Sequence, residues 1–368
     1  MRTSSRHIVV LLLAGAGLLQ ACAAADSDDP AAGSDQADPI GRAAASSDLR
    51  VDIALRQAAY AADEPVIADV TITNAGARKA KLLSWMLPAA DLEESVFVVT
   101  HGGQRAAFLG AHYKRPRAEA SDFVHLAAGA SITRQVDLSR FYDLSRTGDY
   151  DIRLVADERE LRPDDGASAA LVASNTARVW IEARAARPLE PVAISALAGS
   201  LSFSRCSASQ QTTVAQATAV SNSMSDGAVA YLAGTPAANP RYTTWFGTFS
   251  TSGWNTAQSH FTAIADAFDT KPITVDCGCN KKYYAYVYPN QPYTIYVCTV
   301  FWQAPLSGTD SKGGTLIHEM SHFNVVASTD DWAYGQSAAK SLAISDPSKA
   351  LDNADSHEYF AENTPAQP

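Results

Sequence analysis

The chain has 368 residues, of which 46% are hydrophobic and 18% are charged, as in ordinary soluble globular proteins. This length exceeds one ordinary domain, so we expect two domains behind N-terminal leader segments. The formal net charge of −10 argues against a nucleic-acid-binding protein, which needs a basic face to replace phosphate counterions.

The first 22 residues have the pattern of an export signal. Arg2 and Arg6 precede the apolar run 8–19, which is too short to span a bilayer as a helix. The run ends in Leu-Gln-Ala-Cys at Cys22, which resembles a bacterial lipoprotein signal whose cysteine becomes the lipid-modified first residue. An ordinary secretory signal, cut after residues 23–25, is the alternative. The sequence therefore predicts an exported protein, either a cell-surface or outer-membrane lipoprotein attached through Cys22 or a secreted one.

The next two segments differ in pattern. Residues 23–47 are rich in Ala, Asp, Ser, Gly and Pro, which is typical of a disordered tether. Residues 48–185 contain short runs of alternating apolar and polar residues, separated by turn signals. The alternation predicts an antiparallel β-sandwich, which we expect to be immunoglobulin-like and to serve as a pro- or accessory domain. Five runs are predicted as strands: 51–55, 66–72, 95–99, 149–155 and 176–181.

The remaining sequence changes character again. Residues 186–201 contain prolines and small residues and predict a linker or processing region. Residues 202–368 are predicted to form a mainly helical α+β domain, with a strand-like stretch at 283–301. Helices are expected over 207–233, 255–268, 311–326 and 333–345.

Four cysteines remain when Cys22 is set aside, and all lie in this last domain. An even number of cysteines in an exported chain predicts two disulfides. A bridge between Cys277 and Cys279 would be strained, so each is expected to pair with Cys206 or Cys298. A zinc site built from these cysteines is disfavoured because Cys-x-Cys is a poor ligand spacing.

The segment 318–322 reads His-Glu-Met-Ser-His. On a helix, His318 and His322 lie on one face, so their rings can reach one Zn²⁺. Glu319 lies near enough to act as general base on a zinc-bound water. Two accidental surface histidines are the alternative, but the apolar flanks favour a buried helix. The motif predicts a zincin-like metallopeptidase domain with one Zn²⁺.

A catalytic zinc also needs a third protein ligand and an open position. Six residues after His322, where one class of zinc peptidase has a histidine, this chain has Ser328. The first glutamate after His322 is Glu358, which is distant for this role. Asp330 and Asp331 are near enough to turn back towards the metal, and chemistry alone does not choose between them.

The stretch 328–335, Ser-Thr-Asp-Asp-Trp-Ala-Tyr-Gly, resembles the Gly-Thr-x-Asp-x-x-Tyr-Gly motif of aspartate-type zinc peptidases, the deuterolysin or aspzincin family. Within that family, the chain most resembles the peptidyl-Lys metalloendopeptidases. The resemblance implies Asp331 as third zinc ligand and Tyr334 as hydrogen-bond donor to the oxyanion. Ser328 stands where the family usually has Gly, so the motif requires Ser328 to adopt that turn. The resemblance covers about 202–368 and includes 241–247, 286–290 and 353–360.

The resemblance also implies the disulfides Cys206–Cys277 and Cys279–Cys298, which satisfy the strain argument. In the chain-entropy description of disulfides, loops of these lengths stabilise the fold by about 3–4.5 kcal/mol each.

Asp355 and Glu358 match the acidic positions by which the family binds the lysine that follows the scissile bond. Independently, two carboxylates three residues apart on a helix form a compact negative site suited to an ammonium group. The alternative is that both are ordinary surface acids.

The predicted function is a secreted zinc endopeptidase that hydrolyses protein or peptide substrates on the amino side of lysine. One alternative is a deuterolysin-like endopeptidase of broader specificity. Another is a surface lipoprotein whose β-sandwich binds a ligand and whose peptidase domain is inactive.

The N-terminal domain is predicted to inhibit the peptidase, as in a zymogen. Residues 48–185 contain no cysteine, which excludes a cysteine-to-zinc latch. Lys114 could occupy the lysine pocket, with Pro116 hindering cleavage; a solvated basic loop is the alternative.

No lysine occurs between Lys114 and Lys271. A strictly lysine-specific enzyme therefore cannot cut itself in the linker. Either another protease cuts the chain, for example at Arg184 or Arg187, or the specificity is looser, or the domains stay joined.

Overall fold

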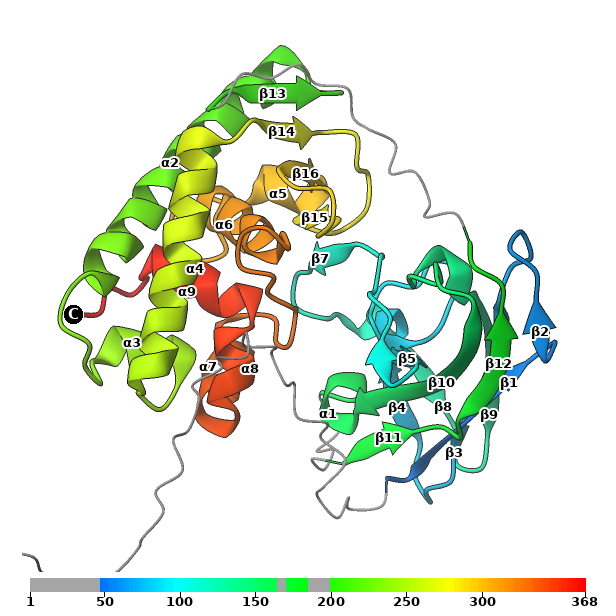
Figure 1. The fold of residues 1–368 in the computed structure, drawn as a ribbon. Coiled ribbons are helices and arrows are strands. Elements are labelled where there is room, and N and C mark those ends of the chain that lie inside the picture. Colours follow the sequence, from blue (N-terminus) through cyan, green and yellow to red (C-terminus); the bar gives the residue numbers. More distant parts are fainter. Residues whose placement is uncertain (1–46, 164–169, 185–198) are drawn as a thin grey trace, which may run out of the picture. The chain divides into compact units, whose positions relative to one another are not determined.

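The structure is a computed structural model that describes residues 47–163, 170–184 and 199–368 (Figure 1). The predicted signal, Cys22, the tether up to residue 46, Arg187 and most of the linker lie outside the described residues. No described helix is both long and apolar enough to cross a membrane.

Strands dominate the described residues before 185. One sheet has the order β1-β3-β9, and another has the order β2-β12-β10-β5-β6 with β11 beside β10. Burial alternates along β3 and β10, so one side of each strand packs into a shared apolar core. All five predicted strands are confirmed to within two residues at each end. The bounds are β1 Leu49–Leu55, β2 Ala59–Tyr60, β3 Ile67–Asn74, β4 Ala80–Leu83, β5 Phe97–His101, β6 Gln104–Arg105, β8 Phe123–Leu126, β9 Ser131–Asp137, β10 Gly148–Asp157, α1 Glu158–Leu161, β11 Leu171–Ala173 and β12 Ala177–Ile181.

The pairing in this β-rich region is not antiparallel throughout. β2 pairs with β12 in parallel, and β4 pairs only with β8, in a separate two-stranded sheet. The β-rich character is confirmed, whereas the immunoglobulin-like topology and the domain limits stay predictions.

The region after residue 199 combines helices with a mixed sheet. Helix α2 matches the predicted 207–233 to within one residue at each end, and α4 contains the predicted 255–268. The bounds are β13 Leu201–Ser204, α2 Ala208–Leu232, α3 Pro240–Phe246, α4 Thr251–Thr270, β14 Ile273–Asp276, β15 Ala285–Val287, β16 Thr294–Val297, α5 Thr299–Gln303, α6 Lys312–His322, α7 Gln336–Ser345, α8 Pro347–Leu351 and α9 Ala354–Glu362.

The sheet of this region has the order β13-β14-β16-β15-β7. Its last strand, β7 (His112–Lys114), comes from the β-rich region and pairs antiparallel with β15 (Figure 1). Alternating apolar runs did not mark this three-residue strand, for which a solvated basic loop was one of the two alternatives. Without β7, β15 would be the edge strand of the sheet.

Two disulfides brace the same sheet. Cys206, just after β13, is bonded to Cys277, just after β14. Cys279 is bonded to Cys298, just after β16. Both pairs agree with those that the resemblance implied.

Helix α6 carries the His-Glu-x-x-His motif and is buried along its whole length. It begins at the N-cap Ser311, whose hydroxyl accepts a hydrogen bond from the Gly314 backbone N–H. Gly314 also permits close packing against α9, because a Cβ there would lie 2.1 Å from Oε1 of Glu362. This contact brings the acidic residues of α9 next to the motif.

The motif helix is shorter than the predicted 311–326. It ends at His322, and Phe323 has an extended backbone. The backbone N–H of Thr329 then donates to the carbonyl of Ser321 at 3.1 Å, so the chain folds back against the helix end. The Ser321 carbonyl therefore accepts its hydrogen bond from the Thr329 backbone, and no further helical turn is needed to supply a donor.

Candidate active site

The motif histidines and Asp331 converge on one point. Nε2 of His318 lies 3.2 Å from Nε2 of His322 and 3.2 Å from Oδ1 of Asp331. Oδ2 of Asp331 lies 3.4 Å from Nε2 of His322. Tetrahedral ligands with zinc bonds of about 2.0–2.1 Å are separated by about 3.3 Å. The three side chains therefore have the spacing of one face of a zinc tetrahedron.

The hydrogen bonding also fits a cation at this point. Both carboxylate oxygens of Asp331 are buried, and beside them the described residues place the Nε2 atoms of His318 and His322 but no well-formed hydrogen-bond donor. Buried carboxylates ordinarily have donors or a cation beside them, because desolvation is costly. Burial opposes the ionisation of Asp331, but His322 and His318 hold its pKa well below the usual range. The donor set of two imidazoles and one carboxylate suits Zn²⁺.

The loop after α6 places the two candidate aspartates differently. Ser328 has a φ of +54°, so it adopts the left-handed turn that glycine favours. His322 Nδ1 lies 2.7 Å from the carbonyl oxygen of Thr329, which keeps a proton on Nδ1 and leaves Nε2 for a metal. The side chain of Asp331 faces the histidines, whereas Oδ1 of Asp330 accepts the Asp331 backbone N–H.

Glu319 is fully buried beside this centre. Neither of its carboxylate oxygens has a hydrogen-bond partner among the described residues. Burial raises the pKa of Glu319 to about 8, although the adjacent His322 acts to lower it. Such a carboxyl group is suited to take and return a proton near neutral pH.

Helix α9 places two carboxylates next to the histidine helix. Oδ1 of Asp355 lies 2.8 Å from Nδ1 of His318, and its Oδ2 accepts the Gly335 backbone N–H. Oε2 of Glu358 lies 3.6 Å from Nδ1 of His318. Both predicted pocket residues are therefore buried, and Asp355 also contacts a predicted zinc ligand.

A lysine side chain from the β-rich region lies between these carboxylates. Nζ of Lys114 is 2.5 Å from Oε2 of Glu358 and 3.1 Å from Oδ1 of Asp355. It is also 3.7 Å from Oδ1 of Asp310, and the side chain is only 1% exposed. Burial acts to lower the pKa of Lys114, but the carboxylates outweigh it and raise the pKa well above the usual value. The lysine is buried as a cation.

The next residue, Arg115, holds the predicted oxyanion donor. Its Nη1 donates to the hydroxyl of Tyr334 at 2.9 Å. Glu93 and Glu94 pair with the same guanidinium at 2.9 and 2.6 Å. Tyr334 thus lies beside the centre, as predicted, but is engaged by a side chain of the β-rich region.

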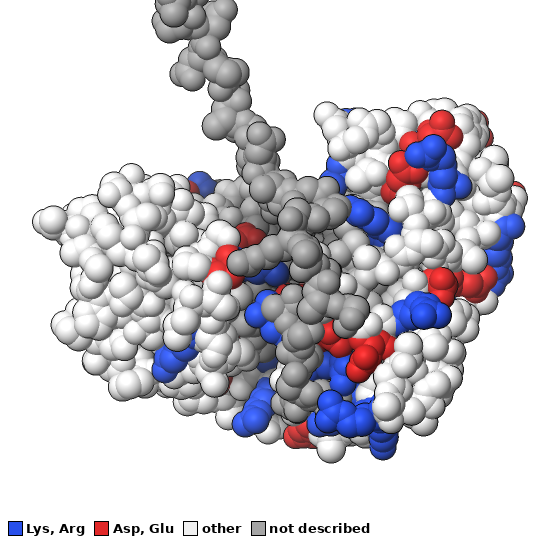
Figure 2. Space-filling model, turned by 90° about the horizontal axis from the view of Figure 1, so that it is seen from below, with Lys and Arg blue, Asp and Glu red and all other residues white. Residues whose placement is uncertain are grey.

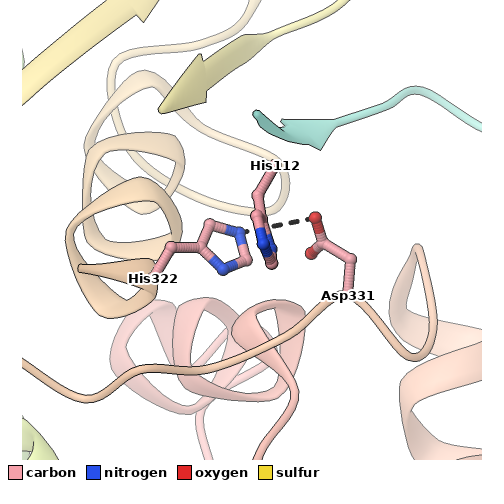
Figure 3. Close-up of side chains that lie close together, drawn as sticks. All are labelled: His112, His322 and Asp331. Atoms are coloured by element: carbon pink, nitrogen blue, oxygen red, sulfur yellow. Dashed lines mark ion pairs between the residues drawn. The ribbon is translucent and has the colours of Figure 1, made fainter. Parts of the chain in front are cut away.

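His112, from β7, also lies close to the point on which the motif histidines and Asp331 converge, which we call the metal point. Figure 3 shows His112 from β7, His322 from α6 and Asp331 from the loop gathered together. A donor atom from each lies within 4.8 Å of the others. The side chains of His112, His322 and Asp331 are largely enclosed. On the face drawn in Figure 2, the exposed charged side chains lie in small groups of both signs.

Sequence reasoning missed four features of this site: His112, Asp310, the hold of Arg115 on Tyr334, and the contact of Asp355 with His318. One signal was present for His112, since His-x-Lys at a strand's period of two places both side chains on one face. The other three depend on segments that are distant in sequence.

Comparison with known proteins places these residues in context. Residues 231–362 match the family Aspzincin_M35, described as "Lysine-specific metallo-endopeptidase". An extracellular protease of Aeromonas hydrophila is 43% identical over 317 residues, covering 83% of this chain and 90% of the relative. A peptidyl-Lys metalloendopeptidase of Grifola frondosa is 37% identical over 314 residues, covering 81% of this chain and 88% of the relative. A solved zinc peptidase from Grifola frondosa is 48% identical and covers 44% of this chain and 100% of that chain, with a TM-score of 0.43.

Proposed function

Because this chain belongs to the Aspzincin_M35 family of zinc metalloendopeptidases, we propose that it hydrolyses peptide bonds on the amino side of lysine. The observation that carries the proposal is the buried ion cluster in which Asp355 and Glu358 hold the ammonium group of Lys114. Relatives named peptidyl-Lys metalloendopeptidases support the same preference.

The proposed roles follow from the positions. His318, His322 and Asp331 hold one zinc ion. Zinc, when bound, supplies a Lewis acid that polarises the peptide carbonyl and lowers the pKa of water. Glu319 takes a proton from the attacking water and returns it to the leaving amine. Tyr334, once free of Arg115, donates a hydrogen bond to the oxygen that becomes negative.

The lysine preference has an electrostatic reason. An ammonium group compensates the buried carboxylates of Asp355 and Glu358, whereas an apolar side chain leaves them desolvated and unpaired. Tyr284 and Tyr359 add ring faces 5.0 and 5.7 Å from the ammonium nitrogen. A flexible stem with a compact charge fits this enclosed site better than a planar guanidinium group.

The same cluster supports inhibition by the N-terminal region. While Lys114 is in the pocket and β7 covers the edge of β15, a substrate can neither insert its lysine nor add a strand to that edge. We therefore propose that the uncleaved chain is a zymogen. The relative named extracellular protease supports secretion, and lipid attachment at Cys22 remains part of the proposal.

The test is a digest of a mixed protein substrate by the peptidase released from its N-terminal region, with peptides identified by mass spectrometry and zinc by atomic absorption. Cleavage before lysine is expected. Glu358→Gln should reduce kcat/KM for lysyl bonds by about tenfold or more, because a buried charge-assisted contact is lost. Asp226→Asn, which removes an exposed carboxylate on α2, is the matched control.

The other outcomes identify the alternatives. Scattered cleavage sites in the digest would favour a deuterolysin-like enzyme of broader specificity and overturn the lysine assignment. Absence of any cleavage by the zinc-loaded released domain would favour the inactive lipoprotein. Asp355→Asn is less suitable for this test, since Asp355 also contacts His318 and its loss should weaken zinc binding.

A further inference from the structure

One short strand directs two side chains at two different parts of the active site. In β7, His112 and Lys114 are two residues apart, so they project from the same face of the sheet. Tyr113 projects from the opposite face and contacts the rings of Tyr283 and Tyr286. The register pairs Val287 with His112 and Ala285 with Lys114, which fixes both side chains along β15.

The ring of His112 lies at the predicted metal centre. Its centroid is 4.8 Å from that of His322, and one of its nitrogens lies within 4.8 Å of donor atoms of His322 and Asp331. Oδ1 of Asp330 is 3.5 Å from Nδ1 of His112. A carboxylate at one ring nitrogen favours a proton there and leaves the other nitrogen with its lone pair.

A zinc centre with three protein ligands and an open position is catalytic, whereas one with four protein ligands is closed. His318, His322 and Asp331 supply three donors. We infer that His112 is a fourth ligand, which closes the open position as long as β7 remains in the sheet. This inference rests on the proposed function, because it concerns the regulation of the same zinc site.

The inference accounts for a difficulty in the zymogen proposal. Lys114 occupies a pocket for the residue after the scissile bond, so the bond between Tyr113 and Lys114 is presented as a substrate bond. Lysine in the pocket does not by itself prevent its cleavage. An imidazole on the metal does, because the position needed for the carbonyl or water is taken. No bond is made or broken in the polypeptide, and removal of β7 reopens the position.

The test uses the full-length chain with Glu319→Gln, so that no variant digests itself. X-ray absorption at the zinc edge should detect three imidazoles in this parent and two when His112→Gln is added. Loaded with Co²⁺ instead, the two proteins should differ in their d–d absorption bands. A chelator should remove zinc from the His112→Gln chain about tenfold or more faster, as is typical for altered metal shells. His125→Gln, on strand β8 of the same region, is the matched control.

Two imidazoles in the parent, or identical spectra and release rates in parent and His112→Gln, would overturn the inference. The parent measurement needs no folded variant, so a His112→Gln chain that loses β7 does not obscure the result.

The outcome is separable from that of the proposed function. The count of imidazoles does not depend on which residue the pocket prefers, so scattered cleavage in the digest leaves it unchanged. Conversely, the released domain could cleave before lysine while the parent shows only two imidazoles. That result would overturn the assignment of His112 as a zinc ligand and leave the proposed function standing.

Discussion

At the residue scale, the site is a set of buried charges whose partners differ. Among the described residues, Asp331 faces the imidazoles of His318 and His322, while Asp355 contacts His318, the Gly335 backbone and Lys114. Glu319 differs from both, because no side chain among the described residues forms a hydrogen bond or an ion pair with its carboxyl group. Burial raises the pKa of this group to about 8, which suits it to proton transfer.

The prediction at this scale concerns Glu319. In the released peptidase, Glu319→Gln should lower kcat by about 10²–10⁴-fold, because the general base is lost. Zinc content should stay the same, since the ligands are on other residues. Kinetics on a lysyl peptide together with metal analysis check both statements. Loss of zinc in parallel with activity would instead assign Glu319 to the metal shell.

At the element scale, the position of α9 against α6 decides which residues meet. Gly314 in α6 leaves room for the side chains of α9. A Cβ there would lie 2.1 Å from Oε1 of Glu362 and 2.9 Å from Cγ of Glu358. Glu362 in turn accepts hydrogen bonds from the backbone and hydroxyl of Ser311, the N-cap of α6. The proposed lysine pocket therefore depends on a helix contact that a single methyl group would disturb.

The corresponding prediction is that Gly314→Ala lowers the free energy of unfolding by about 1–3 kcal/mol, the usual cost of overpacking. Gly227→Ala is the control, since that exposed helical glycine in α2 has no atom within 4 Å of a built Cβ. It should stabilise by about 0.5–1 kcal/mol because alanine favours a helix. Denaturant titration of both variants checks this; equal stability of Gly314→Ala and the parent would show that α9 can move away.

At the scale of the whole molecule, a strand from the β-rich region completes the sheet of the helical region. Within the four residues 112–115, His112 lies near His322 and Asp331, Lys114 contacts Glu358, and Arg115 donates to Tyr334. Residues 115–270 contain no lysine. An enzyme that cuts on the amino side of lysine can therefore separate the two regions by cutting itself only at Lys114.

We therefore predict that Lys114→Ala raises the activity of the full-length chain on a small lysyl peptide by at least about tenfold. Breaking a buried ion pair costs about 3–5 kcal/mol, which favours states with β7 displaced. Lys79→Ala, at an exposed lysine of the same region, should have no effect. An unchanged rate for Lys114→Ala, measured with the chain intact by gel, would argue against inhibition through the pocket.

The sequence by itself determined the local features. Period-two runs located the five strands. The His-Glu-x-x-His motif lies within one short helical segment, so the sequence alone predicted two zinc ligands and a general base at His318, His322 and Glu319. The pairs of cysteines and the choice of Asp331 needed the family resemblance, since spacing left alternatives open. Helix α6 was predicted four residues too long because its end depends on the return of Thr329 to the carbonyl of Ser321.

Only the tertiary structure decided how distant segments meet. The pairing of β7 with β15 joins residues about 170 positions apart, and three residues carry too weak an alternation to be recognised as a strand. The meeting of Lys114 with Glu358, of Arg115 with Tyr334 and of His112 with the metal point all follow from that one pairing. Periodicity reports which face of an element is apolar, but not which partner covers it, because burial is non-directional. The lysine pocket and Lys114 as one possible occupant were predicted from the sequence, and the pairing of β7 with β15 places Lys114 between Asp355 and Glu358.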